Sequence, residues 1–337
     1  MVKTIKKSFT MIELIFVIII LSLIATGSFK AIQMLYMRYY QVNTITKFSI
    51  TSQVLLDETS EILYYRTPIT AIGYSPSDGD FVKLSDVNDS KYKIFEWISE
   101  GFDAKDHIGE DISTGYSGFI DLDSSNKNTL TLVAKDFNIS DTNDTLNQVF
   151  NNNFDLNETV AIIFAGTFDN GDESADIDYK NSFGWHGYDH NKTYTIKSLK
   201  QVGVDANLTM NDEIKNNRVF SKFYLADTGW SIARGEDIKQ DSNCLSQFKM
   251  EQNSLEFNNT LFIFYNYRPW KKESFCADPH NNNGENNEGN VSILAKNVTS
   301  FRVKAVGYHI ELKVQFSKSL YRGSDRNITI TKQKVTF

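Results

Sequence analysis

An almost unbroken apolar run near the start of the chain, Ser8 to Ala25, contains a single carboxylate, Glu13. About 20 apolar residues at a rise of ~1.5 Å cross a hydrocarbon core of ~30 Å. The stretch from Phe9 to about Ala31 therefore predicts a membrane-spanning helix. A charged residue inside such a segment costs roughly 2.5–3.5 kcal/mol on insertion scales, so Glu13 is a candidate functional residue.

The order of short basic leader, apolar run and early acid resembles the class III signal of type IV prepilins and pseudopilins. In that family a membrane peptidase cuts before the apolar run and methylates the new N-terminus. The resemblance places the cut between Ser8 and Phe9 and makes Glu13 the acid four residues after the new N-terminus. The family usually has Gly before the cut, with Ala tolerated, whereas this chain has Ser8.

The alternative is an ordinary secretory signal or membrane anchor. Ala25-Thr26-Gly27 has the small-x-small pattern of a signal-peptidase site at the end of the apolar run. Two observations oppose this interpretation. A secretory core needs no acid, and the amphipathic pattern continues past Ala25 without a break.

The resemblance also implies a role for Glu13. After cleavage Phe9 carries a free ammonium group, which in the family pairs with the carboxylate of a neighbouring subunit. Two ions in a low-dielectric medium are each costly and compensate one another, so their pairing sets the register between subunits. The alternative is an anchor acid near the membrane surface with no partner.

The leader carries Lys3, Lys6 and Lys7, so the positive-inside rule puts it in the cytoplasm and the rest of the chain outside. That outer compartment is oxidising. Cys244 and Cys276 are then expected to form a disulfide, which would close a loop of about thirty residues and stabilise the fold by roughly 3–4 kcal/mol. The alternative is two free, buried thiols, and the spacing matches no zinc or redox motif.

Helical periodicity continues beyond the membrane segment to about Tyr65, where Arg66-Thr67-Pro68 ends it because the residue before proline disfavours the helical region. The remaining chain has short β-type runs between polar clusters. We therefore expect an α+β protein with a leader (1–8), a transmembrane and stem helix (9–65) and a β-rich head (66–337). The predicted strands include 129–133, 160–164, 193–196, 260–265, 309–316 and one from 327 to 337.

The strand 309–316 has the clearest alternation. Its apolar side chains, Ile310, Leu312, Val314 and Phe316, share one face, which predicts a half-buried antiparallel strand. We expect the helical half from about Leu35 to Leu63 to pack on the sheet that contains this strand. The last forty or so residues also resemble the end of large minor pilins of the W type and pseudopilins of the J type.

Two groups of residues could bind a metal. Asp169, Asp172 and Asp176, with Glu173 and Asp178, form an acidic loop that could hold Ca²⁺, although a solvated loop is the default. His186 and His190 stand four apart, but Gly187 opposes the helix that a zinc pair would need, so hydrogen-bonded loop histidines are favoured. The tryptophans are expected in the core rather than on an adhesive surface.

The net charge of −7 and the pI near 5.4 oppose a nucleic-acid platform. The sequence has no His-Glu-x-x-His, Gly-x-Ser-x-Gly, Cys-x-x-Cys or phosphate-binding glycine loop, and we expect neither enzymatic activity nor a cofactor.

The resemblance implies a minor pilin or pseudopilin of a type IV pilus or a type II secretion pseudopilus. Its partners would be other pilin subunits, the prepilin peptidase and the inner-membrane assembly platform. It would cross the bacterial inner membrane once, with its head in the periplasm or on the cell surface. The alternative is a pilin-processed surface adhesin or ligand-binding protein.

Overall fold

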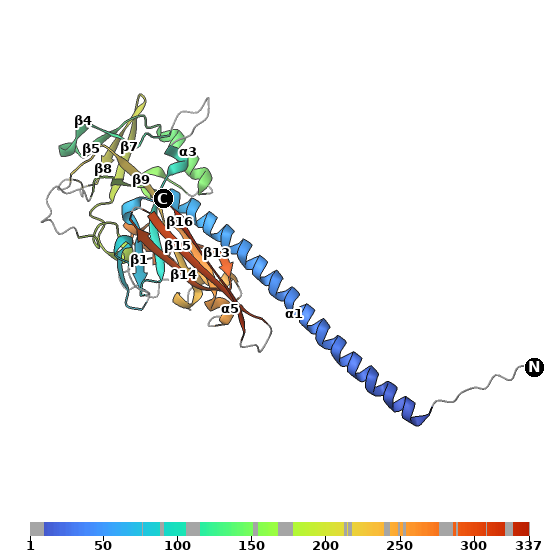
Figure 1. Cartoon of the computed structure of the whole chain (residues 1–337). Helices are drawn as coiled ribbons and strands as arrows, with labels where there is room; N and C mark the ends of the chain where they lie inside the picture. The colour runs from blue at the N-terminus through green and yellow to red at the C-terminus, as the bar shows by residue number, and fades with distance from the viewer. Residues whose placement is uncertain are drawn as a thin grey trace, which may run out of the picture. The chain divides into compact units, whose positions relative to one another are not determined.

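The structure is a computed structural model of the chain. It describes residues 10–75, 77–87, 91–105, 115–150, 154–167, 178–211, 214, 218–238, 243–248, 250–251, 254–275, 286–287, 289–307, 309–320 and 326–336. Two compact units can be distinguished: residues 1–51 with 317–330, and residues 52–316 with 331–337. The second unit contains nearly all of the β-structure (Figure 1).

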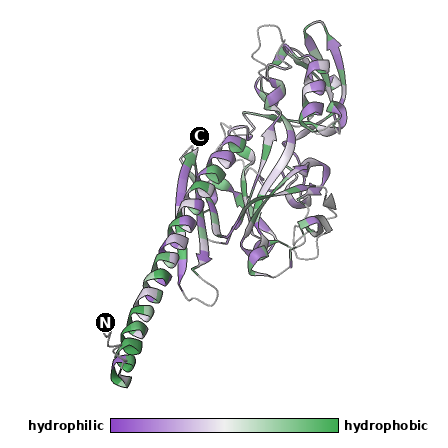
Figure 2. Cartoon of the chain, turned by 90° about the vertical axis from the view of Figure 1, so that its right-hand side faces the viewer, coloured by the Kyte–Doolittle hydropathy of each residue, from purple (hydrophilic) through white to green (hydrophobic). Residues whose placement is uncertain are grey.

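Helix α1 runs from Met11 to Tyr64 without interruption. Its 54 residues correspond to about 80 Å of helix. No proline occurs before Pro68, and Thr67 is already extended at φ −76°, which ends the helix where the sequence predicts. Figure 2 shows that the hydrophobic residues dominate the N-terminal part of α1 and that hydrophilic residues become frequent towards its C-terminal end.

Among the described residues, eleven strands form one antiparallel sheet in the order β2-β1-β3-β9-β6-β7-β8-β5-β4, with β10 paired to β9 and β13 paired to β10. Their bounds are β1 Ile72–Ser75, β2 Asp80–Lys83, β3 Ile94–Glu100, β4 Ile120–Asn126, β5 Thr131–Ala134, β6 Ala161–Phe164, β7 Tyr194–Val202, β8 Asp205–Met210, β9 Phe223–Arg234, β10 Thr260–Tyr267 and β13 Asn290–Lys296. The strands predicted near 129–133, 160–164, 193–196 and 260–265 are confirmed as β5, β6, β7 and β10.

Two hydrophobic cores are built on different strands of this sheet, and the long strand β9 contributes to both. Ala226 and Ala233 lie in the first core, with Trp185, Phe262 and Tyr267. Phe223 and Leu225 lie in the second, with side chains of β5, β7, β8 and of short helices. These helices are α2 (Phe102–Lys105), α3 (Ile139–Val149) and α4 (Leu156–Thr159); α5 (Leu255–Asn258) supplies Phe257 to the first core.

A smaller antiparallel sheet contains β14 (Val298–Val306), β15 (His309–Ser319) and β16 (Asn327–Thr336), and a parallel pair joins β11 (Glu273–Ser274) to β12 (Asn286–Asn287). The alternation predicted for 309–316 is confirmed, because the inward side chains of β15 are 0–3% exposed: Ile310, Leu312, Val314 and Phe316. The predicted final strand is β16.

The part of α1 inside the second unit contacts both sheets. Lys334 Nζ of β16 lies 2.7 Å from Asp57 Oδ1. Glu100 N of β3 donates to Tyr65 O at 2.9 Å, directly after the helix ends. The sequence predicts that the helical half from about Leu35 to Leu63 packs on the sheet of strand 309–316. The second unit begins at Ser52, so this packing stays a prediction for the residues before it. From Ser52 on, Asp57 of α1 contacts that sheet, and Tyr65 adds a bond to the eleven-stranded sheet.

Candidate functional site

Glu13 closes the first turn of α1. The backbone N–H and the hydroxyl of Thr10 both donate to Glu13 Oε2, each at 3.1 Å, and Glu13 N donates to Thr10 Oγ1 at 3.4 Å. This reciprocal arrangement is a capping box, and Thr10-Met11-Ile12-Glu13 is its sequence signature. This cap is not among the roles predicted for Glu13 from the sequence.

The capping box gives Glu13 a role inside its own chain. A carboxylate near a helix N-terminus also interacts favourably with the positive end of the helix dipole. The bonds to Thr10 use Oε2, and a carboxylate has about four acceptor positions over its two oxygens. The cap is therefore compatible with a further cation at the same carboxylate.

The helix that follows Glu13 has an exposed apolar surface along its first eight turns. Leu23 is 70% exposed and Phe29 71%. Two hydroxyls in this stretch are satisfied within the helix, since Ser22 donates to Ile18 O at 2.8 Å and Thr26 to Ser22 O at 2.7 Å. By length and composition α1 can cross a membrane as a single-pass anchor.

Several predicted site residues lie outside the described part of the chain. These are Ser8 and Phe9 of the predicted cleavage site, the side chain of Cys244, Cys276, and the calcium candidates Asp169, Asp172, Glu173 and Asp176. Within the residues described, no group of three or more His, Cys, Asp or Glu side chains is placed to hold a metal ion.

His186 belongs to a buried polar cluster in the first core. It lies in a short turn, Trp185–Gly187, where its own φ is +53°. His186 Nε2 is 2.9 Å from Glu96 Oε1, and the hydroxyl of Tyr267 donates to Glu96 Oε2 at 2.9 Å. The imidazole stacks on Tyr74 with ring centroids 3.8 Å apart. His190 Nδ1 instead lies 3.0 Å from Thr193 O, so the two histidines have separate partners.

A second buried network lies around Ser99 on β3. Ser99 donates to Asp227 Oδ1, and Trp230 Nε1 donates to Ser99 Oγ at 3.2 Å. Side chains alternate along a strand, so Ser99 and Glu96 leave opposite faces of β3. The serine network and the histidine cluster are thus separated by the sheet, and this arrangement does not join a serine nucleophile to a histidine base.

Asp227 is the most perturbed acid of the two networks. Its burial raises the pKa of the carboxyl to about 6, despite hydrogen bonds from Ser99 and from Thr228 N. Glu100 on β3 behaves similarly, because burial raises its pKa while the ammonium group of Lys105, 2.6 Å away, opposes the shift.

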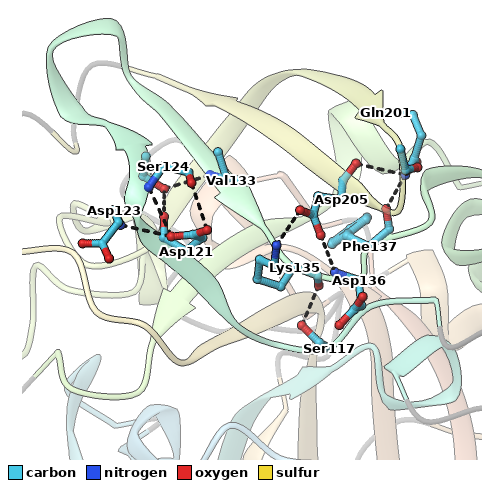
Figure 3. A network of polar contacts seen from close by, with 12 residues as sticks. Ser117, Asp121, Asp123, Ser124, Val133, Lys135, Asp136, Phe137, Gln201 and Asp205 are labelled. Carbon is cyan, nitrogen blue, oxygen red and sulfur yellow. Dashed lines mark hydrogen bonds and ion pairs between the residues drawn. The ribbon is translucent and has the colours of Figure 1, made fainter.

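Figure 3 shows a third polar network, in the part of the head built on the second core. Lys135 Nζ of β5 lies 2.7 Å from Asp205 Oδ2 of β8, and Asp136 N donates to Asp205 Oδ1 at 3.0 Å. Gln201 Nε2 donates to Phe137 O at 2.8 Å. These contacts fix the β7–β8 hairpin against the end of β5, which is a structural role.

The four tryptophans were expected in the core, and three of them lie there. Trp97, Trp185 and Trp270 are at most 3% exposed, whereas Trp230 is only half-buried and lines a cavity. Comparison with known proteins adds no further assignment: no family model, no curated protein and no solved structure matches the chain.

Proposed function

We propose that the chain is a non-enzymatic subunit of a filament of the type IV pilus class, a minor pilin or pseudopilin. The observation that carries the proposal is one carboxylate, Glu13, in the first turn of an uninterrupted 54-residue helix whose N-terminal half is apolar and exposed. A bare apolar helix surface in water is unfavourable, so it requires lipid or other helices.

The proposed assembly step uses the chemistry of the helix start. Removal of the leader by a prepilin peptidase would leave an ammonium group at Phe9, four residues from Glu13. That cation would pair with the Glu13 carboxylate of a neighbouring subunit while the helices leave the membrane together. An isolated charge is costly in this environment, so the pair favours one register between subunits.

The head would remain outside the inner membrane. The exposed helix is apolar and the β-rich body contains many polar residues. This difference fits a helix that packs against the helices of other subunits and a head that contacts other molecules outside the membrane. Partners would be other pilin subunits at the stem and the inner-membrane platform during assembly. The alternative, a pilin-processed protein whose head binds a ligand, is favoured by the cavity beside Trp230.

The test separates the charge of Glu13 from its capping role. Glu13→Ala removes both, whereas Glu13→Gln keeps an acceptor for the Thr10 bonds and removes only the charge. Thr10→Val removes the hydroxyl of the cap and leaves the charge. We expect both Glu13 variants to insert in the membrane yet fail to enter filaments, and Thr10→Val to enter them, as measured by immunoblot of sheared filament fractions.

Normal incorporation of Glu13→Gln would show that the ion pair is not required. Loss of incorporation in Thr10→Val alone would assign the requirement to the helix cap.

A further inference from the structure

Ten asparagines of this chain have Ser or Thr two positions later, and none of the ten is followed directly by proline. Asn-x-Ser/Thr is the acceptor pattern of N-linked glycosylation in exported proteins. Nine of the ten also have Asp or Glu two positions before the asparagine. The nine are Asn88, Asn138, Asn143, Asn157, Asn191, Asn207, Asn258, Asn290 and Asn327. The tenth is Asn297, which has Ala295 at that position.

Composition does not account for this acid. Asp and Glu make up 42 of the 337 residues, so chance would place an acid at about one of the ten positions. The other 21 asparagines give a comparison within the same chain, and three of them have an acid two positions earlier: Asn243, Asn253 and Asn287. The acid therefore accompanies the Asn-x-Ser/Thr pattern and not asparagine in general. Together they form a five-residue pattern, acid-x-Asn-x-Ser/Thr.

The fold does not require this spacing either. Asn143 lies in helix α3, Asn207 lies inside strand β8, and Asn290 is the first residue of β13. The acids also differ in their contacts, because Asp155 caps α4 whereas Asp205 forms an ion pair with a lysine of β5 (Figure 3). No single backbone conformation is shared by these places. The five-residue pattern is therefore a signal that another molecule recognises in the unfolded chain.

Exposure of the side chain decides which asparagines can carry a glycan, because a sugar on Nδ2 must extend into solvent. The exposed ones are Asn157, Asn191, Asn290 and Asn327, and the half-buried ones are Asn138, Asn143, Asn207 and Asn258. Asn88 lies outside the described residues. Asn138 uses both polar atoms of its side chain within the fold, since Oδ1 accepts from Asp141 N at 3.2 Å and Nδ2 donates to Asp141 Oδ2 at 2.6 Å. The four exposed asparagines are therefore the best acceptors.

The hydroxyl end of the pattern is buried at two of these four sites. Thr159 is 6% exposed and Thr193 is 0% exposed. Thr193 Oγ1 donates to Ser182 O at 3.3 Å, and Thr159 Oγ1 accepts from Asp155 N at 3.2 Å. An enzyme that recognises these hydroxyls must bind the chain before the head folds. Glycosylation at these two sites would then accompany export.

We propose that the head is an N-linked glycoprotein, modified at Asn157, Asn191, Asn290 and Asn327 by an oligosaccharyltransferase that recognises acid-x-Asn-x-Ser/Thr. A cationic side chain of that enzyme would bind the carboxylate through a charge-assisted hydrogen bond, which explains why the acid accompanies the pattern. The inference needs an exported head, as the proposed function does, and it does not depend on filament assembly.

The co-substrate is a sugar carried on a lipid diphosphate. Nδ2 of the asparagine attacks the anomeric carbon of that sugar, so that an N–C bond forms while the C–O bond to the diphosphate breaks. The lipid diphosphate leaves with the bonding electron pair, and the amide nitrogen gives up one proton to a base of the enzyme. No oxidant or reductant is needed, and the asparagine remains an amide.

The test begins with the full chain, purified in a non-ionic detergent from the cells that produce it. Proteolytic peptides are analysed by tandem mass spectrometry with a fragmentation method that leaves sugars attached. The peptides that contain the four exposed asparagines should carry the same glycan mass. The peptide with Asn297, which lacks the acid, should have the unmodified mass.

Asp189 offers a matched pair of variants, because it is the acid of the Asn191 site and its side chain is exposed. Asp189→Asn removes the charge and should remove one glycan, the one on Asn191, from the intact mass. Asp189→Glu keeps the charge and should retain that glycan. Neither variant alters the helix start, so the N-terminus of the mature chain serves as an independent readout of processing.

Unmodified asparagine at all four sites would overturn the proposal, as would sugars attached only to Ser or Thr. Full modification of Asn191 in Asp189→Asn would overturn the recognition of the acid. An equal loss in Asp189→Asn and Asp189→Glu would likewise contradict recognition of the charge.

Discussion

Lys334 Nζ in the last strand lies 2.7 Å from Asp57 Oδ1 in α1, which joins two residues 277 positions apart in the sequence. The hydrogen bond with Lys334 is the main cause that lowers the pKa of Asp57 below its usual value. Two residues earlier in the same strand, Lys332 Nζ lies 3.4 Å from Oε1 of Gln53, a neutral residue of α1. Strand β16 therefore contacts α1 near Gln53 and Asp57.

This contact gives a prediction on salt dependence. Both side chains of the ion pair are more than a third exposed, so the pair is screened by salt and contributes little. Lys334→Met should lower the unfolding midpoint slightly at low ionic strength and not at ~1 M salt. The lowered pKa of Asp57 gives stability that is present near neutral pH and is lost as pH falls below about 4. Lys332 also acts on Asp57 through its charge but more weakly than Lys334, so Lys332→Met should show a smaller salt dependence in the same direction.

The buried acid Asp227 predicts the opposite pH dependence. Its pKa rises from 3.8 to about 6 in the fold, so the folded protein binds this proton more tightly than the unfolded chain. Stability then falls as pH rises from about 4 to 6, by on the order of 2–3 kcal/mol. Asp103 adds to the upward shift, and the bonds from Ser99 and Thr228 oppose it.

Asp227→Asn keeps an acceptor for the bonds from Ser99 and Thr228 N and removes the charge. Urea unfolding should show that the variant gains stability over the parent chain between pH 4 and pH 7. Parallel pH profiles for the two proteins would contradict the assignment of this proton to Asp227.

Gly229 of β9 predicts a local packing effect. A Cβ at this position would lie 2.8 Å from Tyr267 Cε2 and 2.9 Å from Cζ, and the Tyr267 ring is fully buried. Gly229→Ala should destabilise the fold by about 1–3 kcal/mol, because the ring must move and its bond to Glu96 weakens. An unchanged thermal midpoint would mean that the ring can be displaced without cost.

Cys244 and Cys276 give a covalent prediction from the sequence alone. If they form a disulfide, alkylation of the denatured, unreduced protein should label neither thiol, and prior reduction should expose both. Mass spectrometry counts the labels. Full labelling without reduction would show that the disulfide is not formed.

The local sequence was sufficient for α1 and β15. The helical pattern of α1 runs without a proline to Pro68, and the alternation from Ile310 to Phe316 identifies a strand with one buried face. Neither conclusion needs information from elsewhere in the chain.

The central strands β3 and β9 were not identified in the same way. Every residue of β3 is buried, so its two faces show no alternation, and it includes Glu96 and Glu100. Glu96 is satisfied by His186 and Tyr267, which lie 90 and 171 residues away. Such partners become neighbours only after the sheet has formed, so the polar residues of β3 look unlike a buried strand in the sequence.

Glu13 and the cavity at Trp230 differ in the same way: the first can be recognised from the local sequence and the second cannot. Glu13 stands out in the sequence because it interrupts an apolar run, and its capping box with Thr10 is a local pattern. The cavity at Trp230 depends on bulges in β9 and β10 and on the end of α1, which are brought together only by tertiary packing.

The most direct test of the account is the N-terminus of the mature protein. The full chain should be expressed with a prepilin peptidase, and the product analysed by N-terminal sequencing and intact mass. The account predicts a mature chain that begins at Phe9 with a methylated amine. A chain that begins near Ser28, after an ordinary signal-peptidase cut, or that retains Met1 in the presence of an active peptidase, would contradict it.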